Sequence, residues 1–134
     1  MSAAGQFVYL DTSVALAHLL SETKAPTDDL WHEPLVSSRL LEYEIHTRLH
    51  ALDLAESHHE FAAALVSRVS LLELARPVLR LPRSRWPTGL RTLDALHLAS
   101  MLFLREQGAE PRLASYDRRL SAAAQELGFA HYAP

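Results

Sequence analysis

The chain has 134 residues, 49% of them hydrophobic and 22% charged, and this balance predicts a folded protein rather than a disordered one. A net charge of −3 argues against a strongly basic nucleic-acid binder, and the absence of cysteine excludes disulfides and thiolate metal sites. No apolar run approaches the roughly 18 residues that span a bilayer and no signal peptide is evident, so we expect one domain, 1–134, in the cytoplasm without a membrane.

The first predicted element is a buried strand over residues 7–10, a short apolar run that stops at Asp11. A helix is expected over residues 14–20. Asp11 would therefore lie at the carboxyl end of a strand, where open α/β sheets bind ligands. Asp-Thr-Ser before a helix is also a good N-cap, so capping alone is the alternative for Asp11.

Residues 21–34 are polar and predict a loop with a short helix holding Leu30 and Trp31. A strand at 35–37 follows, then a helix over 39–55 whose apolar residues repeat at one-turn intervals. Glu44 lies at the edge of this apolar stripe, while Glu42 lies about 200° round the helix. We therefore expect Glu44 to face inward and Glu42 to face solvent.

The middle of the chain predicts a second amphipathic helix over 57–70, capped by Ser57 with Glu60, with Phe61 on its buried face. A strand at 71–75 follows. Residues 76–90 contain three Pro and one Gly and predict broken helix and loop. The loop holds a basic and aromatic cluster, which is either an RNA-facing edge or a solvated loop: Arg80, Arg83, Arg85 and Trp86.

The most apolar helix is expected over residues 90–104. Asp94 lies near its start, and a carboxylate entering a core needs a partner. His97, one turn later, is the local candidate. His97 is otherwise a hydrogen-bonded core histidine, and the sequence also leaves metal ligation open.

The last elements are a strand at 112–115, a helix at 118–127 that begins after Asp117 and ends at Gly128, and a short strand at 129–132. This alternation predicts an α/β domain with a parallel sheet flanked by helices. Because parallel strands end at one edge of a sheet, acids from distant segments are expected to converge there: Asp11, Glu44, Asp94 and Asp117.

Converging carboxylates repel one another unless they take up protons or bind cations. With oxygen ligands and no cysteine, the expected ion is Mg²⁺ or Mn²⁺, which suits phosphodiester hydrolysis. Ser13 and Ser115 stand two residues from Asp11 and Asp117, respectively, and their hydroxyls would orient a carboxylate or a water, or simply cap helices.

Other enzyme classes fit less well. The chain lacks the Gly-rich motifs of P-loop and dinucleotide-binding proteins. Aspartyl-phosphate phosphatases and receivers also place an Asp after a first strand, but they usually need a late lysine, and Lys24 is the only lysine.

Four segments together resemble a PIN domain, specifically a VapC-type toxin ribonuclease: 8–13, 36–44, 90–99 and 113–120. The resemblance implies a three-layer α/β/α fold with a mainly parallel sheet and a Mg²⁺- or Mn²⁺-dependent endoribonuclease acting on RNA. It places the acid quartet on Asp11, Glu44, Asp94 and Asp117. It places supporting hydroxyls on Ser13 and on Ser115, where threonine is more usual.

The resemblance also implies a homodimer and a cognate antitoxin protein that covers the acidic cleft. A shifted helix would offer Glu42 in place of Glu44. Two alternatives remain: a catalytically weak PIN-like module that binds RNA or protein without cutting, and a small phosphatase or phospho-acceptor.

Overall fold

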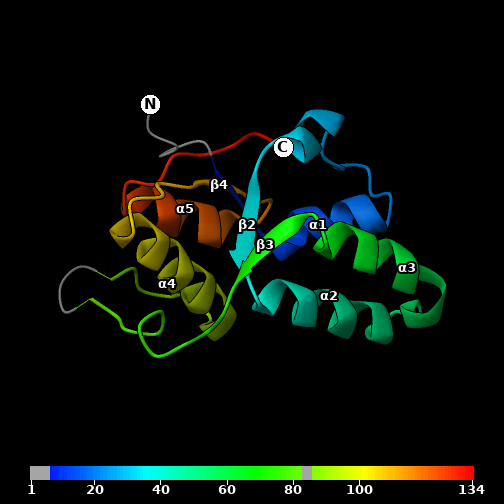
Figure 1. Cartoon of the computed structure of the whole chain (residues 1–134), viewed down its shortest axis with the longest axis horizontal. Coiled ribbons are helices and arrows are strands. Elements are labelled where there is room, and N and C mark those ends of the chain that lie inside the picture. The colour runs from blue at the N-terminus through cyan, green and yellow to red at the C-terminus, as the bar shows by residue number, and fades with distance from the viewer. Residues whose placement is uncertain (1–6, 83–85) are drawn as a thin grey trace.

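A computed structural model describes residues 7–82 and 86–134 (Figure 1). Its centre is a sheet of four parallel strands in the order β3-β2-β1-β4. The strands are β1 (Val8–Leu10), β2 (Leu35–Ser38), β3 (Val69–Leu72) and β4 (Arg112–Ala114). The helices are α1 (Thr12–Leu19), η1 (Asp28–His32), α2 (Leu40–Ala51), α3 (Ala55–Val66), α4 (Thr92–Glu106) and α5 (Arg118–Glu126).

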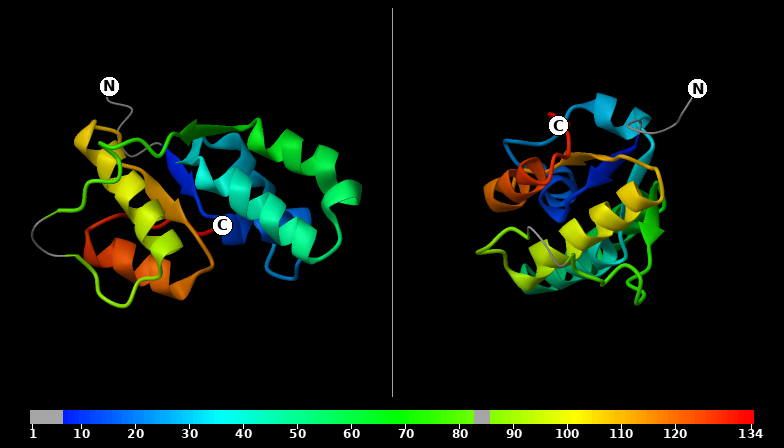
Figure 2. Two further views of the ribbon diagram at one scale, coloured as in Figure 1. Left: turned by 90° about the horizontal axis from the view of Figure 1, so that it is seen from below. Right: turned by 90° about the vertical axis from the view of Figure 1, so that its left-hand side faces the viewer.

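The period-two geometry of β1 divides the core between the two faces of the sheet. Val8 and Leu10 pack with buried residues of α1, α2 and α3, whereas Tyr9 packs with buried residues of α4 and α5. Figures 1 and 2 show these two helix groups on opposite sides of the strands. The chain therefore has the three-layer α/β/α fold that the sequence predicted.

The sheet places the carboxyl ends of β1 and β4, each of which is followed by an aspartate, next to each other. β1 pairs with β2 on one side and with β4 on the other, in register from Val8↔Arg112 to Leu10↔Ala114. The N–H of Asp11 donates to the carbonyl of Ala114 at 3.0 Å, one step beyond the strand. The residues that follow β1 and β4 are thereby held side by side at the carboxyl edge of the sheet.

The boundary between α2 and α3 differs from the prediction. Asp53 has a φ of +58°, so the chain reverses there and α3 begins at Ala55. Ser57 consequently lies inside α3, where its hydroxyl donates to the carbonyl of Leu54, and the predicted capping box is wrong. Phe61 was expected on the buried face but is 68% exposed, because α3 buries Ala62 and Leu65 instead.

Two predicted strands are also corrected. The strand expected at 71–75 is β3, which begins at Val69 because Val69 pairs with Leu35 of β2. The strand expected at 129–132 is reduced to one bridge between Leu113 and His131. Leu113 bonds to Ala130 and Tyr132, whereas the N–H of Phe129 donates to the carbonyl of Ala124 in α5.

The loop that holds the basic and aromatic cluster is only partly described. Residues 76–82 and 86–90 form a loop, as predicted, but they contain none of the broken helix that was also expected there. Arg83 and Arg85 lie outside the described residues. Trp86 packs against the core cluster on the α4–α5 side, and Arg80 is exposed. Within residues 7–82 and 86–134, no helix combines the length and apolarity needed to cross a membrane.

Candidate active site

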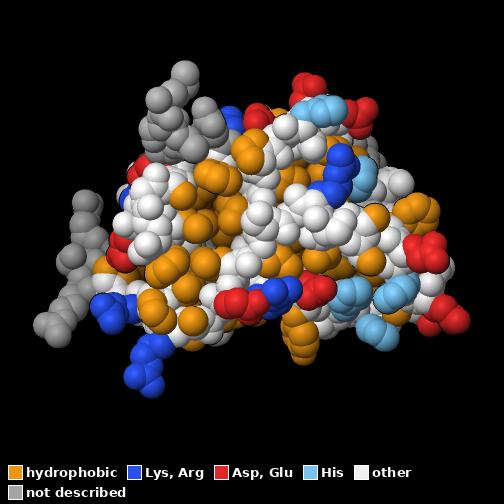
Figure 3. Space-filling view, viewed as in Figure 1, with side chains coloured by type: hydrophobic (Ala, Val, Ile, Leu, Met, Phe, Trp, Pro, Cys, Tyr) orange, Lys and Arg blue, Asp and Glu red, His pale blue; other side chains and the backbone are white. Residues whose placement is uncertain are grey.

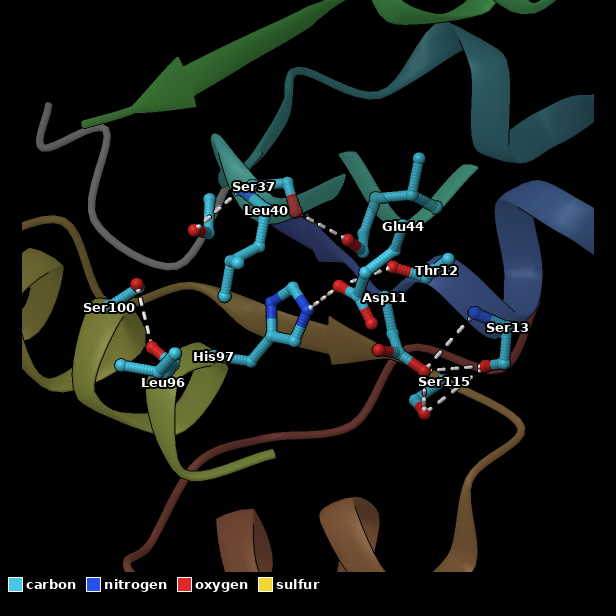
Figure 4. A network of polar contacts seen from close by, with 12 residues as sticks. Asp11, Thr12, Ser13, Ser37, Leu40, Glu44, Leu96, His97, Ser100 and Ser115 are labelled. Atoms are coloured by element: carbon cyan, nitrogen blue, oxygen red, sulfur yellow. Dashed lines mark hydrogen bonds and ion pairs between the residues drawn. The ribbon is translucent and has the colours of Figure 1, made fainter. Parts of the chain in front are cut away.

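Asp11 is the first residue after β1 and is only 6% exposed. It caps α1, and its Oδ2 atom accepts hydrogen bonds from the Ser13 backbone N–H at 3.3 Å, the Ser13 hydroxyl at 2.6 Å and the Ser115 hydroxyl at 2.8 Å (Figure 4). Within the described residues, no group donates to the other oxygen, Oδ1. The capping interactions therefore use one oxygen of the carboxylate and leave the other without a hydrogen bond from the described residues.

Ser13 and Ser115 join the ends of β1 and β4. The hydroxyl of Ser13 accepts the backbone N–H of Tyr116 at 2.9 Å, and the hydroxyl of Ser115 accepts the backbone N–H of Asp117 at 2.9 Å. Each hydroxyl thus accepts a backbone N–H while it donates to Asp11. This double use explains how two small side chains fix both a carboxylate and a strand-to-helix turn.

Ser115→Ala is expected to lower the free energy of unfolding by about 1–3 kcal/mol, because it removes a donor from a buried carboxylate and an acceptor from the Asp117 N–H. Urea denaturation followed by circular dichroism measures this loss. Ser115→Thr keeps the hydroxyl and serves as the matched control. Equal midpoints for Ser115→Ala and the wild type would show that these bonds contribute nothing.

Asp117 caps α5. Its Oδ1 atom accepts the backbone N–H groups of Arg119 at 2.9 Å and Leu120 at 3.2 Å. The helix start thereby fixes the carboxylate beside the end of β4, and no other hydrogen bond to the carboxylate oxygens of Asp117 occurs in the part of the chain that the structure describes.

Glu44, in the second turn of α2, points inward as expected. Its side chain is 19% exposed, and its Oε1 atom accepts the hydroxyl of Thr12 at 3.0 Å and lies 2.6 Å from Nε2 of His97. Glu42 instead forms an ion pair with Arg39 and is 41% exposed. The structure places Glu44, not Glu42, in the site.

His97 is a core histidine with two hydrogen bonds, one of the alternatives left open by the sequence. Its Nδ1 atom lies 2.8 Å from the hydroxyl of Tyr9, and its Nε2 atom bonds to Glu44. Burial lowers the pKa of His97, but the hydrogen bond and charge of Glu44, together with the charges of Asp11 and Asp94, outweigh burial and raise it. The charges of three carboxylates therefore favour the protonated form of the His97 ring.

Asp94 lies in the first turn of α4. Its pKa is raised by burial and then by the charges of Asp117 and Asp11, while His97 and Arg91 offset part of this. The predicted hydrogen-bonded partner for Asp94 does not occur among the described residues: His97 turns to Glu44 instead. Asp94 tolerates this because it is only partly buried, so solvent reaches it.

The structure thus brings acids from four elements to one edge of the sheet, but it does not close them into a cage. No group of three or more His, Asp or Glu side chains within the described ranges is close enough to hold a metal ion. Mg²⁺ does not require such a cage, because it keeps several waters and takes one or two carboxylates. The exclusively oxygen donors of Asp11, Asp94 and Asp117 and the unused Oδ1 of Asp11 fit a hard divalent cation.

Comparison with known proteins agrees with this geometry. Residues 8–126 match the family described as PIN domain. The chain belongs to the PIN domain family. The match to this PIN domain spans every described helix and strand and all four acids at the sheet edge.

Two curated relatives cover nearly the whole PIN domain chain. "Ribonuclease VapC46" of Mycobacterium tuberculosis (strain ATCC 25618 / H37Rv) is 34% identical over 131 residues, covering 95% of this chain and 97% of the relative. "Ribonuclease VapC47" of Mycobacterium tuberculosis (strain CDC 1551 / Oshkosh) is 29% identical over 134 residues, covering 95% and 96%. No solved structure gave a significant match.

Sequence reasoning missed two residues that contact the site. Thr12 was expected only as part of a cap, yet its hydroxyl donates to Glu44. Tyr9 was expected only as an apolar strand residue, yet its hydroxyl bonds to His97. A phenol within an otherwise aliphatic run was the available signal for Tyr9, because a buried hydroxyl needs a partner.

Proposed function

We propose that this PIN domain is the endoribonuclease of a toxin–antitoxin pair and that it hydrolyses RNA phosphodiester bonds with Mg²⁺ or Mn²⁺. The observation that supports the proposal most strongly is that Asp11 and Asp117 lie side by side after β1 and β4, where the Ser115 hydroxyl bonds to both residues. Burial and then the charges of Asp117 and Asp11 raise the pKa of Asp94, in agreement with this placement. Three anions at one partly open edge favour a divalent cation. The relatives' names, both ribonucleases, supply the substrate class.

In the proposed site, Asp11, Asp94 and Asp117 would hold the cation, with Oδ1 of Asp11 as the unbonded oxygen. When bound, such an ion neutralises phosphate charge and makes a water more acidic. Ser13 and Ser115 keep Asp11 in one orientation. Glu44, held through Oε1 by Thr12 and His97, leaves Oε2 to accept a proton from the attacking water.

Removal of divalent cations is expected to abolish RNA cleavage. With the purified chain and a fluorescently labelled single-stranded RNA, EDTA should stop cleavage, and excess Mn²⁺ or Mg²⁺ should restore it, because the carboxylates alone repel the substrate phosphate. Gel analysis of the fragments measures the effect. Undiminished cleavage in EDTA would contradict the metal-dependent mechanism.

The proposed antitoxin site is the groove beside Glu44. It lies between α1, α2 and the start of α4 and has a mainly apolar lining: Thr12, Leu16, Tyr43, Glu44, Thr47, Arg48, Ala51 and Leu93. Tyr43 and Leu93 are 70% and 45% exposed, which is typical of a surface that a partner covers. A segment bound in this groove would lie next to the acids.

A homodimer is also part of the proposal. Hydrophobic side chains gather on the surface over α4 (Figure 3), and Leu79 and Leu81 in the preceding segment are 43% and 53% exposed. Light scattering coupled to gel filtration measures the state directly. The proposed RNA substrate would place the activity in the cytoplasm.

The competing function is a PIN-like module that binds RNA or a protein without cutting. The lack of a closed three-residue metal group in the described chain is the observation that favours it. Calorimetric titration with Mn²⁺ separates the two: heat that disappears in Asp94→Asn supports the nuclease, and its absence from the wild type supports the module.

A further inference from the structure

A short line of polar groups crosses the apolar core and ends at the acidic site. It begins at the hydroxyl of Tyr9 on the central strand, passes through the ring of His97 on α4, and reaches Oε1 of Glu44 on α2, with contacts of 2.8 and 2.6 Å. Tyr9 is 0% and His97 1% exposed. Buried polar groups of this kind are retained only when they are hydrogen-bonded.

The two hydrogen-bond partners of His97 determine which of its ring nitrogens carries a proton. The Glu44 carboxylate accepts, so Nε2 of His97 carries a proton. The Tyr9 hydroxyl donates to Nδ1 when the ring is neutral and accepts from it when the ring is cationic, so it satisfies both states. Burial raises the pKa of Tyr9 far above its ordinary value, and Ser100 and Ser37 offset only part of this, so the hydroxyl keeps its proton.

The same line fixes Glu44. Oε1 is occupied by two donors, the Thr12 hydroxyl at 3.0 Å and His97 Nε2 at 2.6 Å, which come from α1 and α4. Donors from two different helices define both the position and the rotation of the carboxylate. Oε2 accepts no hydrogen bond from the described residues and is the oxygen that remains for water or a cation.

We propose that Tyr9 and His97, together with Thr12, are positioning residues that lock Oε1 of Glu44 and thereby present Oε2 to the reacting groups at the sheet edge. The inference rests on the proposed nuclease function for its catalytic consequence. Its geometry, however, can be tested without metal or RNA. Mutation of residues that hydrogen-bond to a metal-ligating or catalytic side chain typically lowers metal affinity or activity about 10–100-fold.

The first experiment uses the metal-free chain labelled with ¹⁵N in histidine. The His97 ring should show protonated Nε2, with an Nδ1 signal that shifts in Tyr9→Phe, which removes only the hydroxyl. Tyr132→Phe, which alters a tyrosine of the C-terminal segment beside Arg112 and Leu113, should leave the His97 signals unchanged. An unprotonated Nε2 in the wild type, or no shift in Tyr9→Phe, would overturn the proposed line of contacts.

The second experiment measures Mn²⁺ affinity by electron paramagnetic resonance and RNA cleavage for Thr12→Val and Thr12→Ser. Thr12→Val removes the hydroxyl and should lower kcat about tenfold with little change in KM, while Thr12→Ser should stay near wild type. Tyr9→Phe should resemble Thr12→Val. If Tyr9→Phe does not fold, the Thr12 pair decides the result.

The outcomes separate this inference from the function on which it rests. A wild-type chain that neither binds Mn²⁺ nor cuts RNA would refute the proposed function, while the nitrogen spectra would still judge the contact geometry. An active wild type with Thr12→Val within twofold of it in kcat would refute the positioning role, whatever the Mn²⁺ affinity of the variant.

Discussion

Asp11→Asn is expected to lose RNA cleavage by at least about 100-fold while the fold remains intact. The loss follows because a carboxylate at a divalent-cation site contributes several kcal/mol to catalysis, and each 1.36 kcal/mol is a factor of ten. The fold survives because asparagine has the same shape, and its carbonyl can accept the hydrogen bonds that Ser13 and Ser115 donate. Initial rates on a labelled RNA measure the change.

The control for this variant is Asp29→Asn, a substitution of the same kind in an exposed residue of η1. It should cut RNA at the wild-type rate. Circular dichroism and the melting temperature establish that Asp11→Asn is folded. Full activity in a purified and folded Asp11→Asn would defeat the assignment of Asp11 to the site.

Asp94→Asn should lose cleavage to a similar extent but should raise the stability of the metal-free chain at neutral pH. Asp94 has a raised pKa because of burial and because of the charges of Asp117 and Asp11, so its ionised form is disfavoured in the folded state. The folded chain then holds the Asp94 proton more tightly than the unfolded chain. Stability therefore falls as pH rises from the ordinary value of 3.8 through the raised value, and asparagine escapes this loss.

Melting temperatures at pH 3.5 and pH 7, with EDTA or with Mg²⁺, test this second prediction. The advantage of Asp94→Asn should be present at pH 7 and small at pH 3.5, and added Mg²⁺ should reduce it by stabilising the wild type. Asp28→Asn in η1 is the control for a charge change away from the sheet edge. A lower melting temperature for Asp94→Asn in EDTA at pH 7 would contradict the proposed repulsion.

Much of the fold could be predicted because local patterns and global topology agree. The apolar run 7–10 that ends at Asp11 indicated a buried strand, and its alternate residues do separate the two cores. Glu44 could be chosen over Glu42 from its place beside the apolar stripe, and the structure agrees. The catalytic and metal-binding roles of the four acids remain proposals.

The remaining differences have physical causes that a local pattern does not contain. The start of α3 depends on the left-handed conformation of Asp53, and the start of β3 depends on its pairing with β2. The hydrogen-bond partner of His97 depends on how α4 packs against α2. The Nε2 atom of His97 bonds to Glu44 of α2, and not to Asp94, which lies one turn away on its own helix. Long-range packing made these choices, not spacing along the chain.

The bridge between Leu113 and His131 limits how two copies of this chain can associate. β4 lies at the end of the strand order, and an edge strand of this kind can add a strand from another molecule. Here the N–H of Leu113 donates to Ala130, and its carbonyl accepts from Tyr132. The chain therefore covers its own β4 edge at Leu113, and a dimer that continues the sheet at this strand is not expected.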